Sequence, residues 1–170
     1  SSPPSLLSLR ISQLSPSELA STIYSIASNK TNLCSAEKQV ITTEIRRSCE
    51  EFSTHSACDI LWSLGTLRLS LRNKDITFIV ESLLERLNQD KNKITASDMT
   101  HALVGLARLG VTWKRHPRKS FLSALRFVSP YMNEMQISYT VWAMGKTGVT
   151  WNDHHLDART KRAIMTSVEK

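Results

Sequence analysis

Two sets of polar side chains recur at matched positions in four similar segments of the 170-residue chain. The sets are three residues apart, so on a helix they are neighbours on one face. Hydroxyl, carboxyl, amide and imidazole groups can hydrogen-bond to the edges of nucleobases, and a ring can also stack on a base. The first set is Glu18, Ser56, Asp98 and Gln136, and the second set is Ser21, Asp59, His101 and Tyr139. We expect these eight residues to be candidates for contact with bases.

The same residues also fit a purely structural role. Both sets fall near the expected N-termini of helices, where Asp and Glu interact favourably with the helix dipole. Polar side chains at such positions are often simply solvated. The sequence leaves both interpretations open.

Basic residues are the candidates for contact with phosphate groups. The chain has 22 Lys and Arg against 15 Asp and Glu, and its net charge of +7 favours an acidic partner such as nucleic acid. The densest run surrounds Pro117. The phosphate candidates are Arg46, Arg47, Lys114, Arg115, Arg118, Lys119 and Arg162. The alternative is a solvated basic surface, which is what most charge runs are.

Sequence motifs of catalysis are missing. The chain contains no phosphate-binding glycine loop, no G-x-S-x-G and no HExxH. His154 and His155 are adjacent, and a helix points such neighbours about 100° apart, which suits a shared metal poorly. Cys34, Cys49 and Cys58 lack the paired spacing of a zinc site, and we expect them to be reduced thiols. We therefore predict no enzymatic activity, no cofactor, no bound metal and no small-molecule substrate.

The candidate residues lie on four segments that repeat along the chain. The segments are LSPSELASTIYSIA, FSTHSACDILWSLG, ITASDMTHALVGLA and MNEMQISYTVWAMG, which begin at 14, 52, 94 and 132 and so are spaced by 38, 42 and 38 residues. Apolar positions at offsets of three, four and seven define one face of an amphipathic helix. The inward columns are Leu19, Ala57, Met99 and Ile137; Ile23, Leu61, Leu103 and Val141; Tyr24, Trp62, Val104 and Trp142; and Ile26, Leu64, Leu106 and Met144. The next column is small, Ala27, Gly65, Ala107 and Gly145, which suggests that two helices approach closely there.

Each segment begins with a residue that can cap a helix. A side-chain oxygen at this position accepts from a backbone N–H that otherwise lacks a partner. The four residues are Ser15, Ser53, Thr95 and Asn133. Ser15 with Glu18 forms a capping-box pattern, and Thr95 with Asp98 is a near match. Gly110 and Gly148 lie just past the helix as expected C-terminal glycines, and each precedes Val-Thr-Trp.

The tryptophans could be read as stacking platforms, but packing is the favoured interpretation. Trp62 and Trp142 fall in an apolar column, so we expect them in the core. Trp113 and Trp151 follow the two glycines, and we expect them to pack between repeats. Cys58 also falls on the apolar face, so we expect it to be buried.

Second amphipathic helices are expected between the segments, at about 35–50, 73–89, 117–131 and 153–169. A hairpin of two such helices cannot bury its apolar face alone, so neighbouring hairpins must stack. The sequence therefore predicts an all-α protein, an α-solenoid of about four tandem helical hairpins with a 38-residue period and one concave groove. No apolar run approaches the ~18 residues of a membrane span, so we expect no membrane segment. We expect a single helical-repeat domain over 1–170, with repeats at approximately 14–51, 52–93, 94–131 and 132–170.

The segments resemble the octotricopeptide repeat, and more broadly the helical repeats of heptatricopeptide and FAST-kinase-domain proteins. The likeness rests on the 38-residue period and on the pattern seen in LSPSELASTIYSIA, ILWSLGTL and TVWAMGKTG. Val104 departs from the pattern, since the other segments carry an aromatic residue there. The resemblance implies an RNA-binding protein of a mitochondrion, or alternatively of a plastid, that acts in RNA stability, processing or translation. The serine-rich start, which has no acidic residue, fits either the remains of a targeting region or a piece of a longer chain.

Three functions follow as hypotheses. An RNA-binding module should place both polar sets and the 114–119 run on one concave face. A structural subunit of a mitochondrial ribosome, or of another large ribonucleoprotein complex, should contact rRNA and other proteins on several faces. A protein-binding solenoid should line its groove with apolar residues. At one base per repeat, a four-base word recurs about every 256 nucleotides, so we expect this chain to act within a longer array or an assembly.

Overall fold

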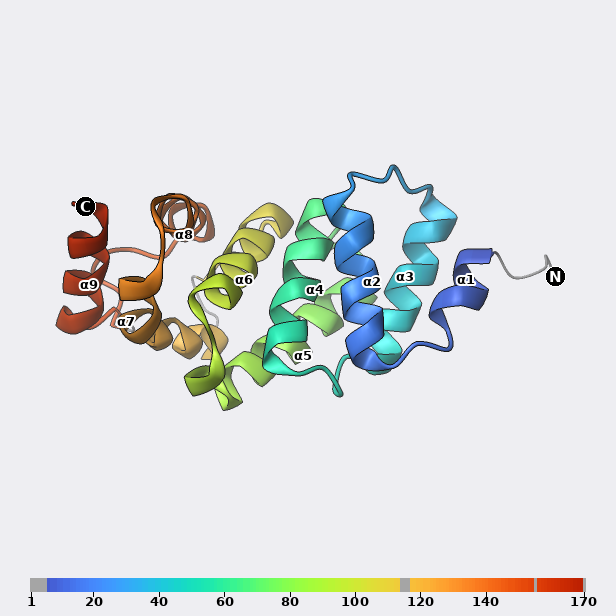
Figure 1. Ribbon diagram of the computed structural model, residues 1–170, viewed down its shortest axis with the longest axis horizontal. Helices are drawn as coiled ribbons and strands as arrows, with labels where there is room; N and C mark the ends of the chain where they lie inside the picture. Colours follow the sequence, from blue (N-terminus) through green and yellow to red (C-terminus); the bar gives the residue numbers. More distant parts are fainter. Residues whose placement is uncertain (1–5, 114–116, 155, 170) are drawn as a thin grey trace.

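The chain folds into helices that form two rows. A computed structural model describes residues 6–113, 117–154 and 156–169, and of residues 117–119 and 167 it describes the backbone alone. Within these ranges it contains nine α-helices and three 3-10 segments, and no strand. The all-α prediction is confirmed for this part of the chain. Figure 1 shows the elements in order from α1 to α9.

The first row follows the four similar segments. It consists of α2 (Pro16–Ser28), α4 (Thr54–Thr66), α6 (Ala96–Leu109) and α8 (Glu134–Thr147), which pack against one another in that order. All four begin after the predicted cap, whose side-chain oxygen accepts from the backbone N–H three residues later. α6 and α8 end at Gly110 (φ 80°) and Gly148 (φ 76°), in the left-handed conformation that glycine adopts without a steric penalty.

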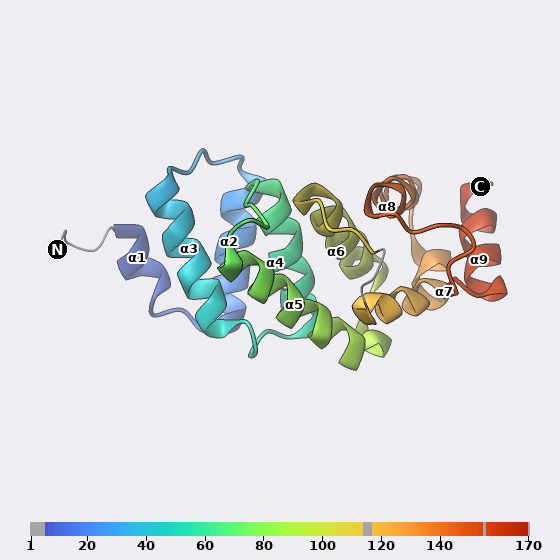
Figure 2. The same ribbon diagram turned by 180° about the vertical axis from the view of Figure 1, so that it is seen from behind.

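The second row lies behind the first. It contains α1 (Leu6–Ile11), α3 (Ser35–Ser48), α5 (Lys74–Gln89), the segment formed by η2 (Pro117–Ala124), α7 (Leu125–Val128) and η3 (Ser129–Tyr131), and α9 (Ala158–Val168). α1 packs on α3, α3 on α5, α5 on η2, and α7 on α9. Figure 2, seen from behind, shows α3 and α5 in front of α2 and α4. A short turn, η1 (Lys91–Lys93), joins α5 to α6.

The expected helix at 117–131 is broken, which corrects the prediction. It consists of η2 (Pro117–Ala124), a single α-turn α7 (Leu125–Val128) and η3 (Ser129–Tyr131). Pro130 has no N–H to continue an α-helix, and the Ser123 hydroxyl donates to the carbonyl of Ser120 (2.8 Å), a local bond that competes with helical pairing. α9 also begins later than expected, because Asp157 caps it by accepting from the Thr160 N–H (2.8 Å).

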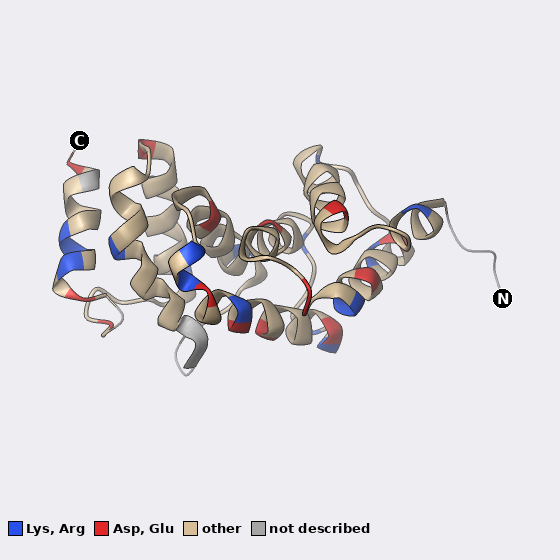
Figure 3. Cartoon of the chain, turned by 60° about the horizontal axis from the view of Figure 1, so that its bottom comes forward, with Lys and Arg blue, Asp and Glu red and all other residues tan. Residues whose placement is uncertain are grey.

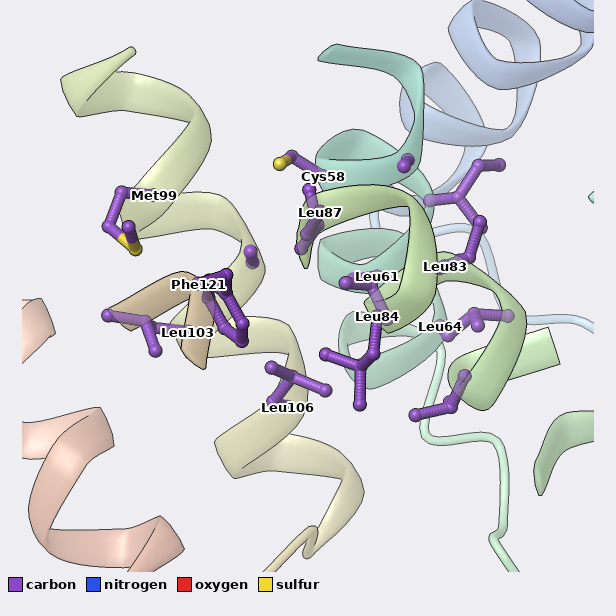
Figure 4. Packing of buried hydrophobic residues seen from close by; sticks show 14 of the residues in the cluster. Cys58, Leu61, Leu64, Leu83, Leu84, Leu87, Met99, Leu103, Leu106 and Phe121 are labelled. Carbon is purple, nitrogen blue, oxygen red and sulfur yellow. The ribbon is translucent and has the colours of Figure 1, made fainter. Parts of the chain in front are cut away.

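The core lies between the two rows. Figure 4 shows leucines of α4, α5 and α6 filling the space between these helices together with Phe121. Those leucines are Leu61, Leu64, Leu83, Leu84, Leu87, Leu103 and Leu106, all fully buried. Burying one leucine side chain contributes about 1.5–3 kcal/mol, so this cluster accounts for much of what holds the rows together. Cys58 is buried here, as predicted.

The last helix of the first row departs from the expected burial. Val141 and Trp142 were assigned to inward columns, but their side chains are 47% and 43% exposed. That assignment is wrong because α9, the described helix beyond α8 in Figure 1, leaves these two side chains open. Trp113 is only 1% exposed, which confirms packing, whereas Trp151 is 45% exposed.

Two glycines bring α4 and α6 into backbone contact. A Cβ atom at Gly105 would lie 2.1 Å from the carbonyl oxygen of Leu61 and 2.6 Å from the amide nitrogen of Trp62. A Cβ atom at Gly65 would lie 2.6 Å from the carbonyl oxygen of Gly105. The close approach expected from the column of small residues is therefore confirmed at Gly65.

Candidate nucleic-acid interface

The first polar set occupies the third residue of each helix in the first row, where it takes part in capping. Glu18 accepts from the Ser15 hydroxyl (2.8 Å), Asp98 accepts from the Thr95 N–H (3.1 Å) and Gln136 accepts from the Asn133 N–H (3.0 Å). Ser56 and Asp98 are buried. The structural role that the sequence left open is thus present for three of the four residues, and two of the four lie away from the surface.

The second polar set lies along one exposed edge of the first row. Ser21 and Tyr139 are exposed, while Asp59 and His101 are partly covered. Asp59 of α4 and His101 of α6 meet across the two helices, with 2.9 Å between Oδ1 of Asp59 and Nδ1 of His101. The structure therefore joins two members of this set to each other and leaves the outer two open.

A histidine outside both sets links them. Nδ1 of His55 lies 2.6 Å from Oδ1 of Asp98, and its Nε2 lies 3.3 Å from Oδ2 of Asp59. The hydrogen bond to Asp98 raises the pKa of His55 above its ordinary value, and the charges of Asp59 and Asp98 act in the same direction. Asp98, His55, Asp59 and His101 thus form a continuous chain of contacts between α4 and α6.

Three aromatic rings, one each from α2, α4 and α6, meet beside this series of contacts. Ring centroids lie 4.9 Å apart for Tyr24 and Trp62, 5.6 Å for Tyr24 and His101, and 5.8 Å for Trp62 and His101. The guanidinium of Arg108 lies 5.9 Å from the Trp62 ring, and its Nη1 donates to the hydroxyl of Thr66 (2.8 Å). All three rings are partly exposed. We call Tyr24, Trp62, His101 and Arg108 the ring cluster.

The ring cluster was only partly foreseen from the sequence. His101 was a candidate, but Tyr24 and Trp62 were assigned to the core, and Arg108 was not singled out. Trp62 does pack against the core, yet one side of it faces the other rings. The available signal was the aromatic residue that recurs in this column in three of the four segments, Tyr24, Trp62 and Trp142.

No family model, curated protein or solved structure matches this chain. The likeness to octotricopeptide repeats therefore stands on the sequence pattern alone.

The phosphate candidates that the structure describes lie on the second row. Arg46 forms an ion pair with Asp75, and its guanidinium stacks 4.3 Å from the centre of the Phe78 ring. Arg47 pairs with Glu44 (2.6 Å) and donates to the carbonyl of Ser12 (3.0 Å), and Arg162 is exposed on α9. Lys114 and Arg115 lie outside the described residues, as do the side chains of Arg118 and Lys119. Arg46, Arg47 and Arg162 are thus on other helices than the ring cluster.

The second row carries mixed charge. Figure 3 shows basic and acidic segments alternating along it, without one continuous basic strip. Glu50, Glu81 and Glu85 line a hollow between α3 and α5, together with Arg86. Three carboxylates there disfavour a phosphate group. Within the described ranges, no group of three or more His, Cys, Asp and Glu side chains is arranged to hold a metal ion, and no helix is long and apolar enough to cross a membrane.

Proposed function

We propose that this protein is a short α-solenoid of four helical hairpins that binds single-stranded RNA along the exposed edge of α2, α4, α6 and α8. The observation that carries the proposal is the ring cluster. Partly exposed rings beside a guanidinium are the kind of surface on which unpaired bases stack. The capped starts of the first-row helices, after Ser15, Ser53, Thr95 and Asn133, support a repeat of about 38 residues.

Within this proposal the polar residues have different roles. His101 and Tyr139 stack on bases, and Ser21 donates or accepts at a base edge. Asp59 orients His101 through their hydrogen bond. Arg108 contacts phosphate, with the net charge of +7 adding long-range attraction. Ser56 and Asp98 are left out of the surface because they are buried.

The affinity should be modest. Stacking contributes about 1–3 kcal/mol per base, and a few bases must offset an association cost of about 4–15 kcal/mol. We therefore expect micromolar binding at best, with weak sequence preference. This suits a module of a larger RNA-binding assembly in an organelle, a mitochondrion by the resemblance and alternatively a plastid.

Arg108 and Arg126 provide a matched test. Each guanidinium lies over an aromatic ring, Arg108 at 5.9 Å from Trp62 and Arg126 at 4.5 Å from Phe127. Only Arg108 belongs to the ring cluster. Binding of random single-stranded RNA, measured over about 50 to 200 mM salt, should weaken in Arg108→Ala, and its salt slope should fall by about one. Arg126→Ala should bind like the wild type.

Two results would contradict the proposal. One is an absence of RNA binding at the lowest salt. The other is an equal loss in the two arginine variants, which would indicate attraction to the overall charge of the protein and no particular surface.

A second function is favoured by a separate observation. Apolar side chains are exposed on α8, including Val141 and Trp142. Such a surface fits a structural subunit of an organellar ribosome or another large complex, which contacts rRNA and protein together. Absence of RNA binding by the isolated protein would favour this function.

A further inference from the structure

One side of α8 has the character of a helix-packing surface, and α9, which lies beyond α8 in Figure 1, leaves it open. Met135, Val141 and Trp142 are exposed there, and a Cβ added at Gly145 would meet no atom within 4 Å. We call these four residues the open face of α8. Soluble proteins seldom leave adjacent large apolar side chains open without an interaction partner.

The protein contains its own example of what covers such a face. In α4, the positions matching Val141 and Gly145 are Leu61 and Gly65, and both are buried against α6. In α6, the position matching Val141 is Leu103, which is also fully buried. The position of Val141 is thus buried on α4 and α6 and open on α8, and on α4 the covering helix is α6.

The loops after α6 and α8 show independently that a position covered after α6 is open after α8. Both read Gly-Val-Thr-Trp, with the glycine in the left-handed conformation and the valine buried. The backbone N–H of Trp113 donates to the carbonyl of Thr147 (2.9 Å) in the last turn of the next first-row helix, α8. Its ring is buried, edge-on to Phe121. Trp151 has the same local sequence and is 45% exposed.

The opposite end of the first row is different. In α6, Asp98, His101 and Gly105 contact the preceding first-row helix, and the matching residues of α2 are Glu18, Ser21 and Ser25, all exposed. A polar outer face of this kind is what closes a row of stacked helices against water. A second copy that stacked this side of its α2 on α8 would therefore bring a polar face onto an apolar one.

We propose that the open face of α8 is a docking site for an amphipathic α-helix of a partner protein, packed parallel to α8 as α6 packs on α4. The partner helix carries a small residue where it crosses Gly145, because only a small residue permits the backbone approach seen between Gly65 and Gly105. It is apolar around that residue, to cover Val141 and Trp142. The site does not rest on RNA binding.

The charge next to the site adds one more feature of the partner. Arg108 lies three residues after Gly105 and donates to Thr66 of α4. The α8 residue that matches Thr66 is Lys146, which is exposed. An acidic residue three positions after the small residue of the partner helix would therefore lie near Lys146.

A helix of this protein can act as the probe. The probe is a fluorescent, hydrocarbon-stapled peptide of residues 94–113 with the substitution Arg108→Glu, which contains Gly105 as its small residue. Stapling reduces the entropy lost when the peptide orders on binding. Its binding to the full chain is followed by fluorescence anisotropy.

The variants test the face and the orientation separately. Gly145→Leu and Trp142→Ser should each weaken peptide binding at least tenfold, and Gly145→Leu should keep its thermal stability because space around Gly145 is open. Tyr131→Ser, an exposed aromatic residue elsewhere, is the matched control and should bind normally. Lys146→Glu should bind the Arg108→Glu peptide worse, and the unsubstituted Arg108 peptide better, than the wild type does.

Three outcomes would overturn the proposal. The first is no binding of the peptide, and the second is equal binding to the wild type and to Gly145→Leu. The third is self-association of the chain in sedimentation experiments that Gly145→Leu abolishes, since a second copy would then be the occupant. RNA binding by the Gly145→Leu variant should be unchanged, so a failure here is separate from a failure of the proposed function.

Discussion

The carboxylate of Asp98, at the start of α6, lies 2.6 Å from Nδ1 of His55 on α4, although 43 residues separate them in the chain. Asp98 is buried and also caps α6 by accepting from the Thr95 N–H. This one carboxylate therefore caps the N-terminus of α6 and also binds α6 to α4. The His55 side chain is 69% exposed, so its ring can exchange protons with solvent. The strength of this contact between the two helices should therefore depend on pH.

The stability of the protein should depend on the protonation of His55. Its pKa is raised above the ordinary 6.5, first by the hydrogen bond to Asp98. A raised folded-state pKa gives stabilisation that is complete below the unfolded-state pKa and is lost as pH rises through the folded-state pKa. The free energy of unfolding of His55→Gln should therefore fall below that of the wild type at pH 6 and approach it at pH 9. Urea titrations of both proteins at several pH values measure this difference.

Asp98→Asn gives an independent check on the cause. Asparagine can still cap α6, but it removes the charged partner of His55. The pKa of His55, followed by NMR titration of its ring protons, should fall toward the ordinary value in this variant. An unchanged pKa would show that Asp98 does not set it.

Adding a methyl group should have opposite effects at two helical glycines. Gly105→Ala places Cβ against the backbone of Leu61, so the helices must separate. Overpacking of this kind costs about 1–3 kcal/mol or more. The clash is with backbone atoms, so we expect the upper end of that range and a net loss of about 2 kcal/mol after the helix-propensity gain of about 1 kcal/mol. Gly145→Ala has open space and should gain up to about 1 kcal/mol. Thermal unfolding of both variants tests the close approach, and equal effects would contradict it.

The two Gly-Val-Thr-Trp loops offer another matched pair. Trp113→Ala removes a buried ring and should cost about 3–5 kcal/mol. Trp151→Ala removes a half-exposed ring, and the free energy of unfolding should change by no more than about 0.5 kcal/mol. Chemical denaturation gives both values. A large loss in Trp151→Ala would mean that Trp151 is already packed in the isolated protein.

The three cysteines should differ in reactivity. Cys34 is exposed, whereas Cys49 and Cys58 are buried. Burial raises the pKa of the Cys58 thiol well above its ordinary value, and the charges of Asp98 and Asp59 act in the same direction, so Cys58 is a protonated thiol at neutral pH. A thiol reagent should modify one cysteine quickly, and Cys34→Ser should remove that fast phase. The other two should react only as the protein unfolds, and fast modification of Cys58 in the folded protein would contradict its burial.

Sequence alone determined the local features of this protein. A cap such as Ser53 and the glycines at 110 and 148 act within a few residues of themselves, so the starts and ends of first-row helices could be located from residue types. The inward columns were also largely right, since burial of Leu61 and Leu103 follows from helical periodicity. The break at 117–131 was missed because the apolar residues of this segment still have the spacing of an amphipathic helix. Its serines and Pro130 interrupt the helix without changing that spacing.

Only the tertiary structure decided which polar and aromatic side chains stay open. Asp98 and Glu18 occupy the same position in their helices, yet Asp98 is buried against His55 of α4 and Glu18 is exposed. Trp113 and Trp151 share one local sequence, yet the Trp113 ring is buried against Phe121 and the Trp151 side chain is 45% exposed. Periodicity fixes the direction in which a side chain points from its own helix, but its exposure depends on a neighbour that comes about 40 residues away, as with Asp59 and His101, which are 42 residues apart.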